Sequence, residues 1–336
     1  MSYREELIET ADIDDLTRYV ERLTDQQDWQ ELVYVRDDCR AAAARGKQLW
    51  PVTAFANYAL ALRAPGDAAA HAIDDAAGPG AAAARFGFGP LTEVAASTHK
   101  WDEVGPYLSI GPSAGVFAHE CVARGADLSD AEDVDGSIFD IPLALAKWEP
   151  PYEVATYKMD KAEFPAPDRP GKKAWSTTSL NGADFSADAE TEEGRAALLE
   201  LAVHWANESN GRVDAAGVAG GVDGALRSLG LTEARLASIP PEDAFAHMAW
   251  AAASGGAHAR RRGAAAGRFA AWWAAAAVAD LTHDWPLSAT ELGEAVDELQ
   301  WYLWDEGHDP VGWSLRLAVE DPEHGLAWAV LATDAD

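Results

Sequence analysis

The stretch from Ala257 to Leu281, AHARRRGAAAGRFAAWWAAAAVADL, constrains the fold more than any other part of the sequence. On a helical wheel, at ~100° per residue, it separates into a small-residue side and an arginine and aromatic side. Gly263 and Gly267 lie four residues apart on the small-residue side, where another helix could approach closely. A helix with little mixed polar surface is usually buried. We therefore predict a central helix over residues 257–281.

Composition limits the classes of partner. The chain has 336 residues, enough for about two domains, and 48% of them are hydrophobic. Its 26 Lys+Arg against 56 Asp+Glu give a net charge of −30. Such a charge repels phosphate backbones, so we expect no nucleic-acid binding. It attracts basic proteins, although adaptation to salt or a coding bias would leave the same composition.

No part of the sequence predicts a membrane segment. The longest uncharged apolar run, residues 269–279, is shorter than the ~18–20 residues that span a bilayer. The acidic N-terminal segment has no apolar core, so we expect no signal peptide. Cys39 and Cys121 are far apart and have no paired spacing, which indicates buried thiols in a reducing compartment. We expect a cytoplasmic protein.

The N-terminal third has the apolar spacing of antiparallel helices. Apolar residues recur at helical intervals in three runs before residue 76: one from Ile13 to Leu23, one from Trp29 to Cys39 and one from Val52 to Leu62. Shorter helices are expected around residues 91–98, 102–108 and 113–123. Helix pairs of this length with short connections are typical of solenoid-like stacking. We predict a helical-repeat-like region over residues 1–126.

From residue 127 onward the pattern changes to that of an α+β region, residues 127–336. Residues 152–158 favour a strand, and residues 162–190, rich in Pro, Asp, Gly and Ser, indicate a long loop. A helix is predicted over residues 192–208, and a strand, a glycine turn and a short helix over residues 212–230. Another helix begins at Pro241.

The C-terminal residues give the clearest local signals. Ser288 and Glu291 form a capping box, which predicts a helix from residue 288 to 306. Alternating apolar residues on both sides of a turn at 321–325 predict a β-hairpin over residues 312–333. We expect this hairpin to pack on the 288–306 helix through Trp301, Trp304, Trp313 and Trp328. The predicted fold is mostly α, with a helical-repeat-like N-terminal layer and a C-terminal α+β region ending in the hairpin.

Three C-terminal segments resemble a known family. The combination AHARRRGAAAGRFAAWW, WYLWDE and GWSLRLAVEDPEHGLAWAV is similar to an uncharacterised family of Ala-rich bacterial proteins, a domain of unknown function. The resemblance covers roughly the last 80 residues, within the C-terminal third. It implies no activity and no site residues.

One short motif suggests an enzyme. Gly111-Pro-Ser-Ala-Gly115 matches the nucleophile elbow of serine hydrolases, in which Ser113 would follow a strand and precede a helix. The alternative is a turn in which Ser113 caps a helix. The repeated strand and helix alternation of such hydrolases is missing, and the nine histidines show no metal-ligand spacing. We predict no catalytic residue, metal or cofactor, and the sequence leaves enzymatic activity undecided.

The central stretch supplies the candidate ligand site. Planar guanidinium groups bind phosphate or carboxylate and stack on aromatic rings, so this face could hold an anionic small molecule. Its candidate residues are His258, Arg261, Arg262, Arg268, Trp272 and Trp273. The alternative, which we favour, is an internal network in which the arginines pair with some of the 56 acids.

The sequence therefore leaves two functional hypotheses from different classes open. The leading hypothesis is a non-catalytic interaction or scaffold protein with an acidic surface and a protein partner, for which a basic partner is the natural choice. The second is an enzyme or sensor that binds an anionic small molecule at the arginine and tryptophan face. The oligomeric state is left open.

Overall fold

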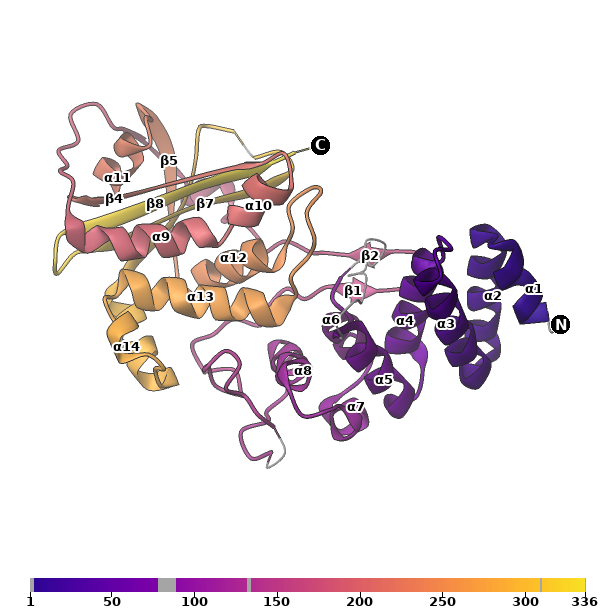
Figure 1. Cartoon of the computed structure of the whole chain (residues 1–336). Coiled ribbons are helices and arrows are strands. Elements are labelled where there is room, and N and C mark those ends of the chain that lie inside the picture. Colours follow the sequence, from indigo (N-terminus) through magenta and orange to yellow (C-terminus); the bar gives the residue numbers. More distant parts are fainter. Residues whose placement is uncertain (1–2, 78–88, 132–133, 309, 336) are drawn as a thin grey trace. The chain divides into compact units, whose positions relative to one another are not determined.

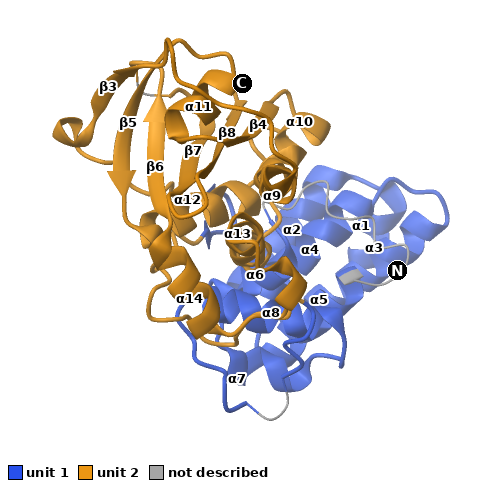
Figure 2. Cartoon of the chain, turned by 90° about the vertical axis from the view of Figure 1, so that its left-hand side faces the viewer, with its two compact units in different colours: residues 1–138, 155–164 blue, residues 139–154, 165–336 orange. Residues whose placement is uncertain are grey.

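The computed structural model describes residues 3–77, 89–131, 134–308 and 310–335. Contacts divide the chain into two compact units (Figure 2). Unit 1 comprises residues 1–138 and 155–164, and unit 2 comprises residues 139–154 and 165–336. Unit 1 thus extends past residue 126, where the predicted helical region ends. No helix in the described ranges is long and apolar enough to cross a membrane.

Unit 1 is a stack of short helices (Figure 1). They are α1 (Tyr3–Thr10), α2 (Ile13–Gln26), α3 (Trp29–Ala44), α4 (Trp50–Arg63), α5 (Gly66–Ala77), α6 (Leu91–Ala96), α7 (Trp101–Val104), the 3-10 turn η1 (Gly105–Tyr107) and α8 (Pro112–Ala123). Helix α2 packs on α4, α4 on α6 and α6 on α8, while α3 and α5 flank α4. Most of these helices therefore contact both their neighbours in the chain and the second helix along, as in solenoids. The predicted helical-repeat-like layer is confirmed.

Local sequence explains where these helices begin and what they bury. Asp12 caps α2 by accepting a hydrogen bond from the backbone N–H of Asp15 at 3.0 Å. Leu16 and Val20, four residues apart, are then fully buried on one side of α2. The strand expected over residues 152–158 is reduced to β1 (Thr156–Tyr157), which pairs with β2 (Ala162–Glu163) in a two-stranded hairpin of unit 1.

Unit 2 is an α+β structure. Its strands are β3 (Ser176–Ser179), β4 (Arg212–Ala219), β5 (Glu233–Ile239), β6 (Gln300–Asp305), β7 (Trp313–Asp321) and β8 (Leu326–Asp334). Its α-helices are α9 (Glu192–Glu200), α10 (Val203–Glu208), α11 (Val222–Ser228), α12 (Pro241–Ala253), α13 (Ala264–Val278) and α14 (Ala289–Glu298). Short 3-10 turns, η2 (Lys172–Ala174), η3 (Ala189–Thr191) and η4 (Thr282–Asp284), connect some of them.

The six strands form one antiparallel sheet in the order β3-β5-β6-β7-β8-β4. Helices α9, α12 and α13 belong to the layer on one face, with Trp328 and Leu317 buried against it. Helix α11 covers the other face over Val218 and Ala327. Successive strand residues enter these two cores alternately, as the pleat of a strand requires. The predicted C-terminal hairpin is confirmed as β7 and β8.

The central helix is shorter than predicted. It spans Ala264–Val278, and residues 257–263 form a loop that ends at Gly263, whose φ of +99° favours glycine. Gly263 is therefore not on the face expected to meet another helix. Gly267 is on that face: a Cβ atom there would lie 2.3 Å from the backbone oxygen of Ala249 in α12. The close approach of two helices is thus real at one of the two glycines.

The predicted helix over residues 288–306 is wrong in its second half. Helix α14 ends at Glu298, and residues 300–305 form β6 between β5 and β7. The sequence QWYLWD is rich in aromatic residues, which favour strands, and Trp301 and Trp304 enter the cores on opposite faces of the sheet. The prediction that these tryptophans join the hairpin to a helix is therefore wrong. They lie in β6, which pairs with β7 of the hairpin, with Trp301 opposite Val319.

Two other segments differ from expectation. The predicted loop over residues 162–190 contains the edge strand β3, whose sequence STTS lacks an apolar pattern. The predicted helix over residues 192–208 is divided into α9 and α10 at residues 201–202. Neither change alters the class: the fold is mostly α with a C-terminal α+β region.

Candidate functional site

Arg268, the central residue of the predicted anion site, is used inside unit 2. Its side chain is fully buried and pairs with Glu149, with Nε to Oε2 at 2.7 Å and Nη2 to Oε1 at 2.8 Å. Its Nη1 and Nη2 also donate to the backbone oxygens of Pro142 and Ala144 at 2.7 and 2.9 Å. Arg268 is therefore paired internally, the alternative that the surplus of acids favours.

The structure does not gather the other predicted site residues around Arg268. Arg262 lies in the loop before α13 and contacts the imidazole of His204, which in turn lies 3.1 Å from Glu208. His258 is in the same loop, and its backbone N–H donates to the Ser209 hydroxyl at 3.1 Å. Arg261 precedes Arg262 in this loop and is half-buried.

The two predicted tryptophans lie in α13 and belong to the core. Trp272 is fully buried and lies 5.2 Å from Trp148 between ring centroids. Trp273 is half-buried and packs edge-on against Trp285. The arginine and tryptophan face is therefore divided between a loop and the interior of unit 2.

Ser113 does not have the surroundings of a nucleophile elbow. The possible strand before it, Tyr107–Ile110, is absent: Tyr107 ends the 3-10 turn η1, residues 108–110 are not in a strand, and Ser113 is the second residue of α8. Unit 1 is helical there, so the sharp turn from strand to helix on which the motif depends is missing. The expectation of a strand before Ser113 is wrong.

Unit 1 carries a concave feature that no sequence motif marks. In a stack of antiparallel helices every second connection lies at the same end, so the connections α2–α3, α4–α5 and α6–α7 share one end with the segment after α8. Residues of these four segments line two neighbouring cavities of about 540 and 420 Å³. His99 and Asp102 line both cavities. We call the two cavities together the turn groove.

The larger cavity is acidic and aromatic. Trp29 and Tyr107 contribute rings, while Asp67, Asp102 and Glu103 contribute carboxylates. Arg63 is the cation in its lining. Among the described residues, Asp102 has no hydrogen-bonding or ion-pair partner, whereas Glu103 accepts from the backbone N–H of Lys100 at 2.8 Å. The cavity of 540 Å³ therefore has an excess of negative charge.

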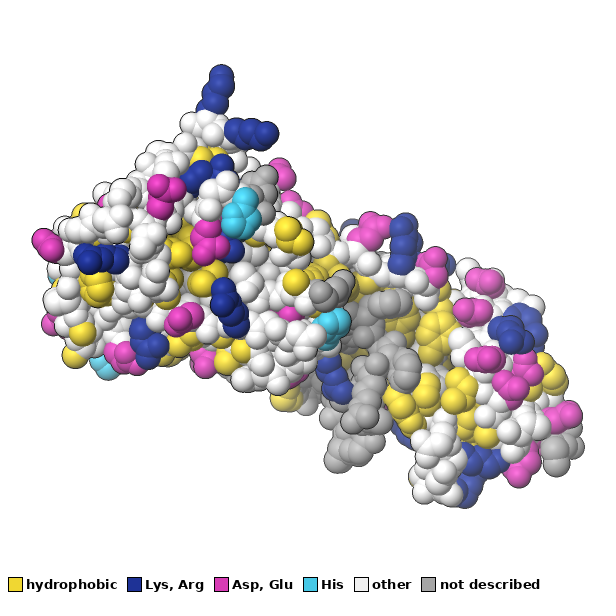
Figure 3. Space-filling model, turned by 90° about the horizontal axis from the view of Figure 1, so that it is seen from above, with side chains coloured by type: hydrophobic (Ala, Val, Ile, Leu, Met, Phe, Trp, Pro, Cys, Tyr) yellow, Lys and Arg dark blue, Asp and Glu magenta, His cyan; other side chains and the backbone are white. Residues whose placement is uncertain are grey.

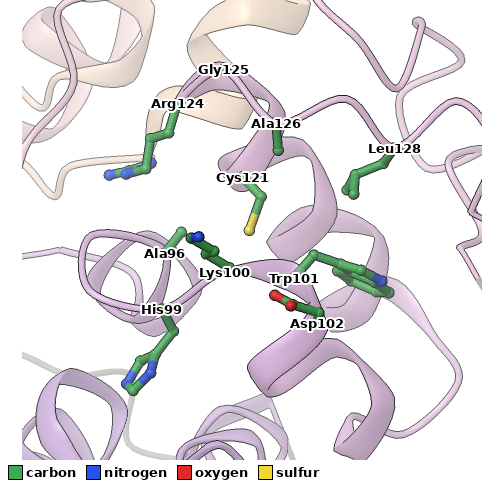
Figure 4. Close-up of a pocket in the computed structure, with 10 residues that line it drawn as sticks. All are labelled: Ala96, His99, Lys100, Trp101, Asp102, Cys121, Arg124, Gly125, Ala126 and Leu128. Carbon is green, nitrogen blue, oxygen red and sulfur yellow. The ribbon is translucent and has the colours of Figure 1, made fainter.

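The smaller cavity is lined mainly by apolar groups. Ala96, Trp101, Cys121, Ala126 and Leu128 form much of its wall. In Figure 4 the Cys121 sulfur and the Asp102 carboxylate point toward each other, and the Arg124 guanidinium points to one side. Burial raises the pKa of Cys121 to about 12, so this sulfur is a neutral thiol and not a nucleophile.

Arg124 adds little charge to the smaller cavity. Its Nη1 donates to Oε2 of Glu120 at 2.9 Å, one turn earlier on α8. Glu120 and Glu93 are both fully buried, and Tyr157 donates its hydroxyl to Oε2 of Glu93 at 2.6 Å. These contacts hold the β1–β2 hairpin against α6 and use Arg124 as a structural counterion.

His99 is the polar side chain at the boundary between the two cavities. Burial lowers its pKa, opposed by the nearby charge of Glu103 and by a hydrogen bond to the backbone of Ala61. The ring is therefore neutral near pH 7. Its Nε2 atom is buried and has no hydrogen-bonding partner in the structure. His99 therefore separates the two cavities without adding a charge to either.

The connections that line the turn groove are closely packed. A Cβ atom at Gly66 would lie 1.7 Å from the backbone oxygen of Glu103, so only glycine lets the α4–α5 connection lie against α7. Thr98 donates its hydroxyl to the backbone oxygen of Leu62 at 2.8 Å, which attaches the α6–α7 connection to α4. The groove is a preformed feature of the helical stack.

Residues 14–336 match a family of unknown function, DUF6183. The chain belongs to this family. The match covers nearly the whole chain and not only the C-terminal third, over which the resemblance was expected. Comparisons with curated proteins and with solved structures gave no match.

In this member of DUF6183, the sequence does not reveal the turn groove, because the lining of the groove comes from four separate segments. Neither His99 nor Asp102 belongs to a motif. The residues close to them in the sequence that also line the cavities lie at the ends of helices and have no distinctive pattern. Helical spacing could have located the connections, but not the cavities between them. The acidic composition does not locate a site either: on the face seen in Figure 3, acidic side chains are interspersed with Lys and Arg.

Proposed function

We propose that the chain is a non-catalytic binding protein that holds a protein partner in the turn groove of unit 1. The observation that carries the proposal is the groove itself, two neighbouring cavities lined by helix ends along one edge of the solenoid-like stack. Solenoids commonly use extended concave surfaces for protein partners. The net charge of −30 favours a basic partner.

Two further observations support a binding role in a reducing compartment. Both cysteines are buried free thiols, and burial raises the pKa of each to about 12, which makes them unreactive. Ser113 lies in a helix and not at an elbow. Binding of an anionic small molecule at the arginine and tryptophan face is the weaker proposal, because Arg268 is engaged by Glu149.

The experiment compares two tyrosine variants of the full chain as baits in a lysate. Tyr107, 61% exposed, lines the groove, whereas Tyr34, 47% exposed, lies on α3 away from it. We expect one stoichiometric partner that remains bound at ~0.15 M salt and is lost with Tyr107→Ala but not with Tyr34→Ala. Captured proteins that all dissociate at this salt concentration, or that both variants retain equally, would contradict the proposal.

A further inference from the structure

The larger cavity of the turn groove selects for positive charge. Its lining has three carboxylates, from Asp67, Asp102 and Glu103, against the single guanidinium of Arg63. Asp102 has no ion-pair partner among the described residues and lies beside both cavities. The rings of Trp29 and Tyr107 add faces on which a cation can lie. A carboxylate ligand would meet repulsion here, whereas an ammonium or guanidinium group would be attracted.

His99 does not oppose this preference. Its ring is neutral, because burial lowers its pKa, so it adds no positive charge between the two cavities. Its Nε2 atom is buried, out of reach of a bound group, and contributes no contact to the selection. The preference for a basic side chain therefore rests on the three carboxylates and the aromatic rings of the larger cavity.

The smaller cavity selects for an apolar side chain. Trp101, Leu128 and the neutral thiol of Cys121 form its wall, and its volume of about 420 Å³ accommodates a large aliphatic or aromatic side chain. Lys100 also lines this cavity and would repel a cation there. The two cavities therefore prefer different side chains, and this difference fixes which side chain of a bound segment occupies which cavity.

We infer that the turn groove binds an extended protein segment in which a lysine or arginine occupies the 540 Å³ cavity and an apolar side chain occupies the 420 Å³ cavity. In an extended segment, residues i and i+2 point the same way, ~7 Å apart. Because His99 and Asp102 border both cavities, such neighbouring side chains enter them together. The inference rests on the proposed function and specifies the chemistry of its partner.

The test uses a phage-displayed library of random peptides, selected on the full chain. We expect the selected peptides to carry Lys or Arg two residues from a large apolar residue. One of them, made synthetically, is then titrated calorimetrically against variants whose folding has been checked by circular dichroism. Asp102→Lys should weaken binding by about tenfold or more, because it puts a like charge beside the cation. Asp14→Lys, an exposed acid on α2, should leave the affinity unchanged.

A third variant tests the apolar cavity. Ala126→Trp fills its edge and should also abolish binding of the same peptide. Peptides that lose binding with Ala126→Trp and Tyr107→Ala, but contain no basic residue or are insensitive to Asp102→Lys, would overturn this inference and leave the proposed function standing. Peptides insensitive to every groove variant would overturn both.

Discussion

Arg268 and Glu149 are 119 residues apart in the sequence and form a fully buried, two-bond ion pair. Two parts of unit 2 meet there: α13 provides the arginine, and residues 142–149 provide the carboxylate and two backbone acceptors. Tyr152 donates its hydroxyl to Glu149 at 2.6 Å and completes the network. The arginine that was a candidate for a ligand site thus fixes an irregular segment to the central helix, as the favoured interpretation of internal pairing predicts.

Removal of the arginine alone should be costly. Arg268→Ala leaves the Glu149 carboxylate buried without its partner, and breaking a buried pair in this way typically costs ~3–5 kcal/mol. Urea unfolding of the purified variant measures the loss. The double variant Arg268→Met with Glu149→Leu should be much closer to wild type, because no charge remains buried. An Arg268→Ala protein as stable as wild type would mean that the arginine serves something other than the fold.

Gly267 should tolerate no side chain. Its missing Cβ would lie 2.3 Å from the Ala249 oxygen and 2.8 Å from the Ala253 Cβ, so Gly267→Leu forces α12 and α13 apart. Overpacking of this kind costs ~1–3 kcal/mol or more. The matched control is Gly171→Ala, where no atom lies within 4 Å of the added Cβ. Equal unfolding free energies for the two variants would show that the helices do not meet at Gly267.

Unit 2 should lose stability on mild acidification through His247. Burial lowers the pKa of this histidine from 6.5 to about 4, assisted by the charge of Arg169 and opposed by a hydrogen bond to the backbone of Asp168. Between these pH values the unfolded chain binds a proton that the folded protein refuses, so unfolding is favoured as pH falls. The contribution is about 3 kcal/mol over this range and constant above pH 6.5.

Urea unfolding of wild type and His247→Phe at several pH values between 7 and 4 isolates this contribution. The variant should lose less stability over the interval than wild type. His71→Gln, an exposed histidine on α5, is the control and should keep the wild-type dependence. Parallel curves for wild type and His247→Phe would show that the ring is not held neutral.

The cysteines should be unreactive in the native protein. Burial raises the pKa of Cys39 and Cys121 to about 12, so at pH 8 the thiolate fraction is very small. With a chromogenic disulfide reagent we expect no release from the folded chain and full reaction of both thiols in urea. Rapid native labelling of Cys121, which lines the smaller cavity, would mean that the cavity opens and its thiol ionises.

The sequence predicted elements that carry their own periodicity. Examples are the alternation of apolar residues in β7 and β8 and the helical spacing of apolar residues in α2 to α4. These patterns depend only on neighbours within one segment, so they can be recognised from the sequence alone. Residues 299–305 have an ambiguous pattern: Leu292, Val296, Leu299 and Leu303 fit a helix as well as Trp301 and Leu303 fit a strand. These residues form strand β6 because β5 and β7 pair with it, one on each side.

The sites were harder to predict, since they depend on partners that are remote in the sequence. Arginines near tryptophans suggest a ligand face, but whether Arg268 meets an anion or Glu149 depends on where a proline-rich segment 119 residues away is placed. The turn groove depends on the spacing of four connections, and no single residue in it is unusual. His99 and Asp102 line cavities only because α4, α6 and α8 stack on one another.

Site-specific photocrosslinking shows whether a partner binds at the turn groove. A photoreactive phenylalanine analogue replaces Tyr107 in the groove or, in a parallel protein, Tyr34 on α3, and each is irradiated in lysate. We predict that position 107 gives one discrete crosslinked protein, whose crosslinked peptide contains a basic residue, and that position 34 does not. No crosslink from position 107, or the same products from both positions, would contradict binding in the turn groove.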